Sequence, residues 1–283
     1  MHRKQCVRAA FIVSMLLAWS VVSIPLYGAD NNNAALTEEF HHTYPLAAGG
    51  RISLENINGS VHVSSWDRNE VKIDAIKRAD DKQDLDEARI EVEADNNSVS
   101  IRTKYPEHQN YSEGRHLASV EYTLTVPKNV RLDKFNLING SLDVHDISGQ
   151  VNASCINGKL TATGLSGTIR LATVNGRAEA EISPSGNDPL EISSVNGPVE
   201  LTLPSDAKAR IEATTISGSI DNSFGLHVNR HRFVGRDLQG ELGGGGTLIR
   251  LNNVNGRIEI HRANDGHTLG PVKDLTPHGE SDI

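Results

Sequence analysis

The chain has 283 residues, and its 36 acidic side chains outnumber its 28 basic ones, which gives a formal net charge of −8. An acidic balance of this kind opposes binding to nucleic acid and to anionic lipid headgroups, so we expect no nucleic-acid partner. Only 4% of the residues are aromatic, which argues against a lectin-type site built on stacked rings. Cys155 is the only cysteine beyond residue 29, which excludes an internal disulfide in a processed chain.

Residues 1–29 have the pattern of a secretory signal peptide, with three basic residues followed by the uncharged residues 9–29. This pattern predicts export to the periplasm or out of the cell. Removal of the segment would leave 36 acidic against 28 − 3 = 25 basic side chains, a net charge of −11. Tyr27 is a large residue where a cleavage site prefers a small one, so an uncleaved membrane anchor is the alternative. Residues 30–35 are predicted to be a flexible lead.

Residues 36–129 are predicted to form an N-terminal β region. Apolar and polar residues alternate there with the period of two that indicates a strand with one buried face. The predicted strands are Arg51–Ile57, Ser60–Ser65, Glu70–Ile76, Arg89–Ala94, Ser98–Lys104 and Ser119–Val126. Since the end of a stacked repeat exposes an apolar cross-section, we expect these strands to act as a cap.

One short motif recurs along the chain: an aliphatic residue, Asn or Ser, Gly, a residue that is polar in all copies but one, and another aliphatic residue. Nine copies centre on Gly59, Gly140, Gly149, Gly158, Gly167, Gly176, Gly197, Gly218 and Gly256. The five copies from Gly140 to Gly176 are nine residues apart, and the residue before Gly alternates between Asn and Ser. Nine residues hold one strand and one corner, so the alternation indicates an 18-residue repeat with two strands per coil.

Glycine suits a corner because it adopts positive φ without a Cβ clash, and Asn tolerates this region better than most residues. The predicted corner residues are Asn139, Gly140, Ser148, Gly149, Asn157, Gly158, Ser166, Gly167, Asn175, Gly176, Asn196, Gly197, Ser217, Gly218, Asn255 and Gly256. Asn is expected to stack on Asn along one edge.

We therefore predict an all-β fold. Residues 130–262 are expected to form a parallel β-solenoid with two strands per coil of about 18–21 residues. Residues 222–246 are an insertion in this repeat. Residues 263–283 are predicted to be a disordered tail, because they are polar and rich in Gly, Pro and Asp.

Several sequence motifs make the chain similar to a known bacterial family. They are the Asn-Gly and Ser-Gly repeats, Leu203-Pro204-Ser205-Asp206 leading into residues 211–218, and Gly243–Gly246 leading into residues 248–256. Over residues 40–262 the chain resembles the β-strand-repeat proteins named "putative adhesin", a domain of unknown function. The resemblance implies an exported or membrane-anchored protein of the cell envelope, and it offers no catalytic motif.

One column of acidic residues is a candidate cation site. If the coils stack in sequence order, the third residue after each corner glycine on one edge faces outward in a single column. Its acidic members are Asp143, Glu179, Glu200 and Asp221. Since like charges on neighbouring strands repel, one hypothesis is that a divalent cation such as calcium binds this ladder through carboxylate oxygens. The alternative is a solvated acidic face, and no other cofactor is expected.

Taken together, the sequence predicts a non-enzymatic, exported envelope protein that acts as a scaffold or an interaction surface. Two polar sheet faces are expected to present regular columns to a protein, to a glycan or to a second copy of the chain. One alternative is an envelope-stress accessory protein held in the membrane by residues 9–29. The other is a polysaccharide-active β-helix enzyme that pairs carboxylates drawn from Asp143, Glu179, Glu181 and Glu200.

Overall fold

The computed structural model describes residues 35–106, 117–182, 188–231 and 234–275. The predicted signal segment and nearly all of the predicted lead lie outside these ranges. No helix within the described ranges is both long and apolar enough to cross a membrane. The described chain is built of strands with one short helix, α1 (Lys82–Glu87), so the predicted all-β class is confirmed.

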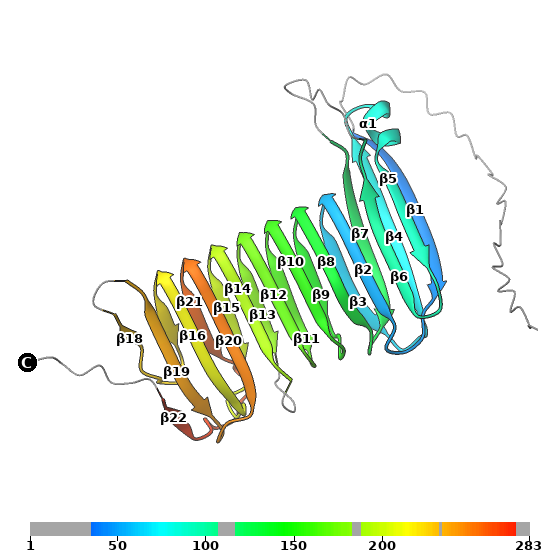
Figure 1. Cartoon of the computed structure of the whole chain (residues 1–283). Helices are drawn as coiled ribbons and strands as arrows, with labels where there is room; N and C mark the ends of the chain where they lie inside the picture. Colours follow the sequence, from blue (N-terminus) through cyan, green and yellow to red (C-terminus); the bar gives the residue numbers. More distant parts are fainter. Residues whose placement is uncertain (1–34, 107–116, 183–187, 232–233, 276–283) are drawn as a thin grey trace, which may run out of the picture. The chain divides into compact units, whose positions relative to one another are not determined.

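The strands form two large sheets (Figure 1). The ten-stranded sheet has the order β1 (Leu36–Pro45), β4 (Glu70–Ala79), β7 (Ser119–Pro127), β3 (Val61–Trp66), β9 (Leu142–His145), β11 (Leu160–Leu165), β13 (Ala178–Ile182), β15 (Val199–Leu203), β21 (Ile258–Arg262) and β17 (Ile220–Asn222). The other sheet has the order β18 (Asn229–Arg230), β19 (Arg236–Leu242), β16 (Ala209–Ser217), β20 (Thr247–Asn255), β14 (Leu190–Asn196), β12 (Ile169–Asn175), β10 (Val151–Asn157), β8 (Arg131–Asn139), β2 (Arg51–Asn58), β6 (Ser98–Lys104) and β5 (Arg89–Ala94). With β22 (Val272–Asp274), which pairs with β19 off this path, it is a twelve-stranded sheet.

From β8 to β17 the chain alternates between the two sheets. Neighbouring strands in this part of each sheet pair in parallel; β10 lies between β8 and β12, and β11 lies between β9 and β13. Val151 pairs with Ile169, 18 residues further along the chain. The 18-residue repeat that the Asn and Ser alternation predicts is therefore confirmed in the strand register.

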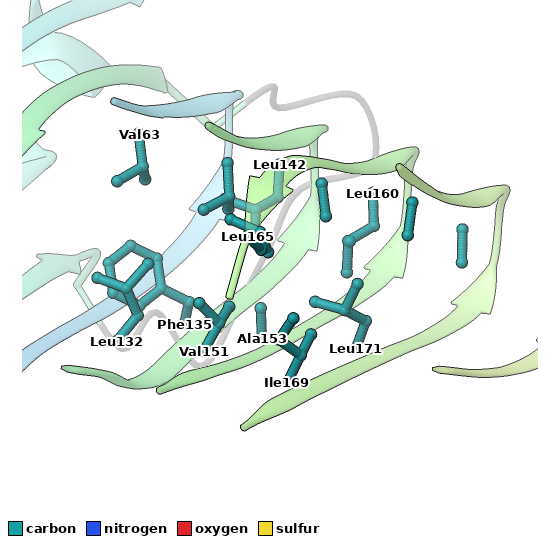
Figure 2. Packing of buried hydrophobic residues seen from close by; sticks show 14 of the residues in the cluster. Val63, Leu132, Phe135, Leu142, Val151, Ala153, Leu160, Leu165, Ile169 and Leu171 are labelled. Carbon is teal, nitrogen blue, oxygen red and sulfur yellow. The ribbon is translucent and has the colours of Figure 1, made fainter. Parts of the chain in front are cut away.

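Aliphatic side chains fill the space between the two sheets, because strand alternation turns every second side chain inward. Figure 2 shows Leu142 and Leu160 of the ten-stranded sheet facing Val151, Ile169 and Leu171 of the twelve-stranded sheet. All five are at most 1% exposed. Full burial of one such side chain contributes about 1.5–3 kcal/mol, so these inward columns supply most of the stabilisation of the fold.

The corner glycines are required by sterics as well as by backbone conformation. A Cβ on Gly140, Gly158 or Gly197 would lie 2.0 to 2.2 Å from a carbonyl oxygen of the corner stacked beneath it. These three glycines also have positive φ, between 142° and 155°. Gly176 does not have positive φ, yet its Cβ would lie 1.9 Å from the carbonyl oxygen of Gly158. Positive φ therefore explains part of the corner pattern, and close backbone stacking explains the rest.

The Asn residues at these corners form a side-chain ladder along one edge, as predicted. In spatial order the ladder contains Asn58, Asn139, Asn157, Asn175, Asn196 and Asn255. Each Nδ2 donates to the Oδ1 of the preceding Asn at 2.9 to 3.0 Å. The ladder satisfies the amide groups of neighbouring strands in one register and therefore favours that register over its alternatives.

The order of the last coils differs from sequence order. Strand β20 lies between β14 and β16, and β21 lies between β15 and β17, so the last repeat inserts between two earlier ones. As a result Asn255, rather than Ser217, follows Asn196 in the ladder. The inserted order extends the amide ladder by one residue and places Ser217 at its end.

The insertion and the tail are more ordered than the sequence suggests. In the insertion, β19 pairs antiparallel with β16. The prediction of a disordered tail is wrong for residues 263–275, because β22 pairs antiparallel with β19 and Asp265 accepts a hydrogen bond from the backbone N–H of Ser205. Strand β22 has only three residues, so the composition of the tail does not reveal it. Residues 276–283 lie outside the described chain.

All six predicted N-terminal strands are present, with bounds within three residues of those expected. Strand β1 was not predicted. It pairs antiparallel with β4 at the edge of the ten-stranded sheet, and most of its residues are exposed and polar, so no alternation marks it. Strands β1 and β5 are the outermost strands of their sheets at this end.

Candidate functional site

The outer face of the twelve-stranded sheet carries a column of aliphatic residues beside the edge that holds the Asn ladder and Ser217. This column, here called the stripe, contains in spatial order Ile138, Ile156, Val174, Val195, Val254 and Ile216. Its members are between 37% and 54% exposed. The strand register aligns them, because the corner residues that follow them pair across neighbouring strands. The sheet therefore presents a continuous line of apolar side chains to solvent.

Strand alternation explains the position of the stripe. In β12, Leu171 and Thr173 are buried between the sheets, whereas Arg170, Ala172 and Val174 face outward. Each repeat thus presents three kinds of outward position, which are polar or charged, small or polar, and aliphatic. The prediction of two polar outer faces is wrong for this sheet.

Small residues beside the stripe leave a groove of about 500 Å³ on this face. Ser154, Ala172 and Ser193 line it at the middle outward positions of β10, β12 and β14. All members of the stripe except Ile138 also line it. A concave and mainly apolar surface of this volume lies within the range of about 300–1,000 Å³ that small-molecule sites occupy.

Polar groups border the groove on both sides. The Asn ladder follows the stripe at the corners. On the opposite side lie two cross-strand ion pairs, Arg170–Glu191 at 3.7 Å and Arg250–Glu212 at 3.2 Å. The groove is therefore an apolar channel with polar margins, and it runs across the strands rather than along them.

The outer face of the ten-stranded sheet carries the predicted acidic column in a different order. Glu179 pairs with Glu200, but the next neighbour of Glu200 is Glu259, and Asp221 lies beyond it. Asp143 lies two strands from Glu179. The predicted adjacency of Glu200 and Asp221 is wrong, because β21 inserts between β15 and β17.

Basic side chains pair with several carboxylates of this acidic column. The pairs are Lys159–Glu179 at 2.6 Å, Arg177–Glu200 at 2.5 Å and Arg257–Glu259 at 2.8 Å. His62 Nδ1 lies 3.0 Å from Asp143 Oδ2. These contacts offset the repulsion between like charges on neighbouring strands. The cation ladder and the carboxylate pair of a polysaccharide enzyme both stay predictions.

A second cluster of candidate metal ligands lies where the turn after β15 meets the chain after β21. Within the described residues, Asp206, Asp265 and His267 are the only group of three acidic, cysteine or histidine residues whose ligand atoms gather within 4.8 Å, and all three are exposed. The backbone N–H and the hydroxyl of Ser205 both donate to Asp265 and hold its pKa at about 2. The carboxylate thus fixes the chain after β21 to the turn after β15.

No family model matches the chain, and no curated protein is similar to it. Its structure is similar to a "putative cell adhesion protein" from Clostridium sporogenes, with 14% sequence identity, a TM-score of 0.46, and 80% of this chain and 100% of that chain covered. A "putative adhesin" from Bacteroides fragilis gives 8% identity and a TM-score of 0.32, with 80% and 97% covered. At these identities and TM-scores the similarity carries no functional information.

The stripe is the main feature that the sequence analysis missed. From the sequence alone, no face was assigned to the aliphatic residue two positions before each corner glycine. Before the Ser148 and Ser166 corners this residue is buried, since Ile147 and Leu165 are at most 1% exposed. On the edge of the Asn ladder, which Ser217 ends, the same position faces solvent. The 18-residue repeat contained the signal, because it separates the two edges.

Proposed function

We propose that this chain is a non-enzymatic, exported protein of the cell envelope and that it acts as an adhesin-like interaction scaffold. The two sheets would be the walls of a parallel β-solenoid, capped by the strands of residues 36–129. The stripe and its groove on the twelve-stranded sheet would be the contact surface. The observation that carries this proposal is the stripe, a line of six aligned aliphatic side chains that face solvent.

The fold does not need aliphatic residues at the stripe positions. The inward columns already supply the core, and polar residues serve equally well at outward positions of the other sheet, such as Thr161, Glu179 and Thr202. An exposed apolar patch with polar margins is typical of surfaces that contact a partner. This supports a binding role for the groove rather than a purely structural one.

Export rests on the pattern of residues 1–29, and we place the protein in the periplasm or outside the cell. An uncleaved residue 9–29 segment would anchor the same scaffold to the membrane as an accessory protein. Sequencing the N-terminus of the protein isolated from its own cells distinguishes the two forms. A chain that begins near residue 30 supports release, and one that begins at Met1 supports the anchor.

The binding role is tested by sedimentation of the purified protein with envelope fragments of its own cells. The double variant Val174→Gln/Val195→Gln makes the centre of the stripe polar, and we expect it to reduce the bound fraction at least tenfold. The matched control is Thr161→Gln/Thr202→Gln on the ten-stranded sheet, which should bind like the wild type. Equal binding of all three proteins would contradict the proposed function.

A further inference from the structure

The ten-stranded sheet ends at β1 with an unpaired edge (Figure 1). Beyond the coil of β2 and β3 this sheet continues with β7, β4 and β1, whereas the twelve-stranded sheet continues only with β6 and β5. The ten-stranded sheet is therefore one strand longer at this end, and β1 is the extra strand. In agreement with this, every residue of β1 is at least partly exposed. Within the described residues, no strand pairs with its outer edge.

Strand β1 is longer than the strands at the other sheet edges and lacks the usual protection of an edge. Its register with β4 runs without a break from Leu36 to Pro45. By contrast, β5 has six residues, β17 and β22 have three, and β18 has two. Natural sheets protect their edges with lysine, proline or bulges, or by keeping the strand short. Strand β1 contains no lysine and no bulge, and its one proline is its last residue, so its edge is available to another strand.

The sequence of β1 is complementary to itself when it is read in the opposite direction. Residues 36–44 read Leu-Thr-Glu-Glu-Phe-His-His-Thr-Tyr, with Phe40 at the centre. In an antiparallel pair of two copies centred on Phe40, residues equally far from Phe40 on either side are opposite each other. The opposed pairs are then Phe40 with Phe40, Glu39 with His41, Glu38 with His42, Thr37 with Thr43, and Leu36 with Tyr44. Each pair joins two apolar residues, two threonines, or a carboxylate and an imidazole, which are favourable cross-strand combinations.

The neighbouring registers of the same pairing oppose like groups. A centre between two residues would oppose side chains of different faces, so the centre can move only by whole residues. A pair centred on Glu39 opposes two carboxylates, and a pair centred on His41 opposes two imidazoles. Like charges that are directly opposite destabilise an antiparallel pair. The edge therefore favours one register with a second copy of itself.

The side chains of β1 are accessible for this pairing. On the outer face, His41 Nδ1 lies 2.7 Å from Asp74 and its Nε2 lies 3.1 Å from Glu39. These hydrogen bonds, that to Asp74 first, raise the pKa of His41 and so favour its positive form. The side chains of His41 and Glu39 are 57% and 67% exposed. On the inner face, Phe40 and Tyr44 are only partly buried against the core.

We infer that two copies of this chain form a two-fold dimer through antiparallel pairing of their β1 strands, centred on Phe40. The two ten-stranded sheets then join into one continuous sheet. Pairing of residues 36–44 exchanges about eight to ten backbone hydrogen bonds, close to the roughly ten of a typical protein interface. Since the stripe lies on the other sheet, the dimer goes beyond the proposed function and does not depend on it. Such a dimer carries two stripes.

Sedimentation equilibrium of the purified protein over about 1–100 μM tests the dimer. We expect the mean mass to rise from that of one chain to that of two and no further, because a two-fold contact uses the same edge of both copies. Glu39→Lys and His41→Glu each oppose like charges across the pair and should weaken the dimer at least tenfold. An equimolar mixture of these two variants restores opposite charges at both positions and should dimerise like the wild type.

Two controls separate this edge from the other surfaces. Glu93→Lys makes the same change of charge on β5, the other free edge at this end, and should leave the dimer unchanged. Val174→Gln/Val195→Gln on the stripe should also leave it unchanged. Loss of the dimer in either control would overturn the inference. So would a wild type that stays monomeric up to about 100 μM, or one that grows beyond two chains.

Cysteine cross-linking tests the register without the charge variants. Thr37 and Thr43 are exposed, and in the pair their Cα atoms lie about 4.5–5.5 Å apart, within reach of a disulfide. A mixture of Thr37→Cys and Thr43→Cys, oxidised with copper phenanthroline, should form a covalent dimer at least tenfold faster than either variant alone. In each variant alone the two new thiols lie about 20 Å apart, and Cys155 is 1% exposed. A mixture that cross-links no faster than the single variants would also overturn the inference.

Discussion

The two outer faces of this protein are built from the same repeat and have opposite chemistry. On the ten-stranded sheet the outward columns are polar, and their charges are paired, as in Lys159–Glu179. On the twelve-stranded sheet the column beside the corners is aliphatic and exposed over six strands. One strand architecture thus tolerates either chemistry on its outside. The fold therefore does not dictate the chemistry of its outer faces.

The largest expected effect concerns the corners that both faces share. Gly176→Ala should destabilise the protein by about 3 kcal/mol or more, because its Cβ would lie 1.9 Å from the carbonyl oxygen of Gly158 in a stack that cannot separate locally. Gly49→Ala is the control, since Gly49 has a φ of 76° and no atom lies within 4 Å of its added Cβ. It should cost about 1–2 kcal/mol from backbone strain alone. Equal losses in urea unfolding would show that backbone conformation, and not stacking, selects glycine.

The second effect compares the inward and outward positions of one strand. Leu171→Ala removes a side chain that is 1% exposed, and we expect it to cost about 2–5 kcal/mol of unfolding free energy. Val174→Ser, three residues later on the outer face, should change stability by about 0.5 kcal/mol or less. Urea unfolding of both variants measures the difference. A loss above about 1.5 kcal/mol for Val174→Ser would mean that the stripe is part of the core after all.

A smaller effect is expected at the edge of the stripe face. Asn175 donates to Asn157 and accepts from Asn196, so Asn175→Ala breaks two exposed hydrogen bonds. We expect a loss of about 1 kcal/mol in thermal or urea unfolding. Ser166→Ala, at a corner on the opposite edge, is the control and should be close to neutral. A neutral Asn175→Ala would show that backbone pairing alone sets the register.

The smallest effect is on the charged part of the twelve-stranded face. Lys134, and with it Arg102, holds the pKa of Glu55 below its ordinary value. The unfolded chain therefore binds this proton more readily, so the contribution of Glu55 is present above about pH 4.5 and is lost as the pH falls through its folded pKa. Glu55→Gln should cost up to about 1 kcal/mol at pH 7 and less at pH 3. A loss that is the same at both pH values would contradict this assignment.

Most of the strand architecture can be predicted from the sequence because the signals that specify it are local. Glycine, asparagine and the alternation of apolar residues each act within a few residues, so the repeat, the inward columns and the Asn ladder could be predicted. The order of the last coils could not be predicted from spacing, because either order satisfies the same inward columns. The corner residue was the missed signal, since only Asn255 can extend the ladder beyond Asn196.

The candidate site was harder to predict because it depends on which strands become neighbours, and this is not a local property of the sequence. The acidic column was predicted without Glu259, since that residue enters only through the inserted strand β21. The stripe was difficult to predict because an aliphatic residue in a strand usually indicates burial. Exposed Val174 and buried Ile147 differ only in the edge of the repeat at which their corners lie.

The most direct test of the account is thiol footprinting of the two faces. Val174→Cys places a thiol in the stripe, and Glu181→Cys places one on the outer face of the ten-stranded sheet. Cys155 is 1% exposed and burial raises its pKa, so it should not react with maleimide in the folded protein. With envelope fragments bound, the account predicts slower labelling of Val174→Cys and unchanged labelling of Glu181→Cys. Unchanged labelling of Val174→Cys, or protection of Glu181→Cys alone, would contradict it.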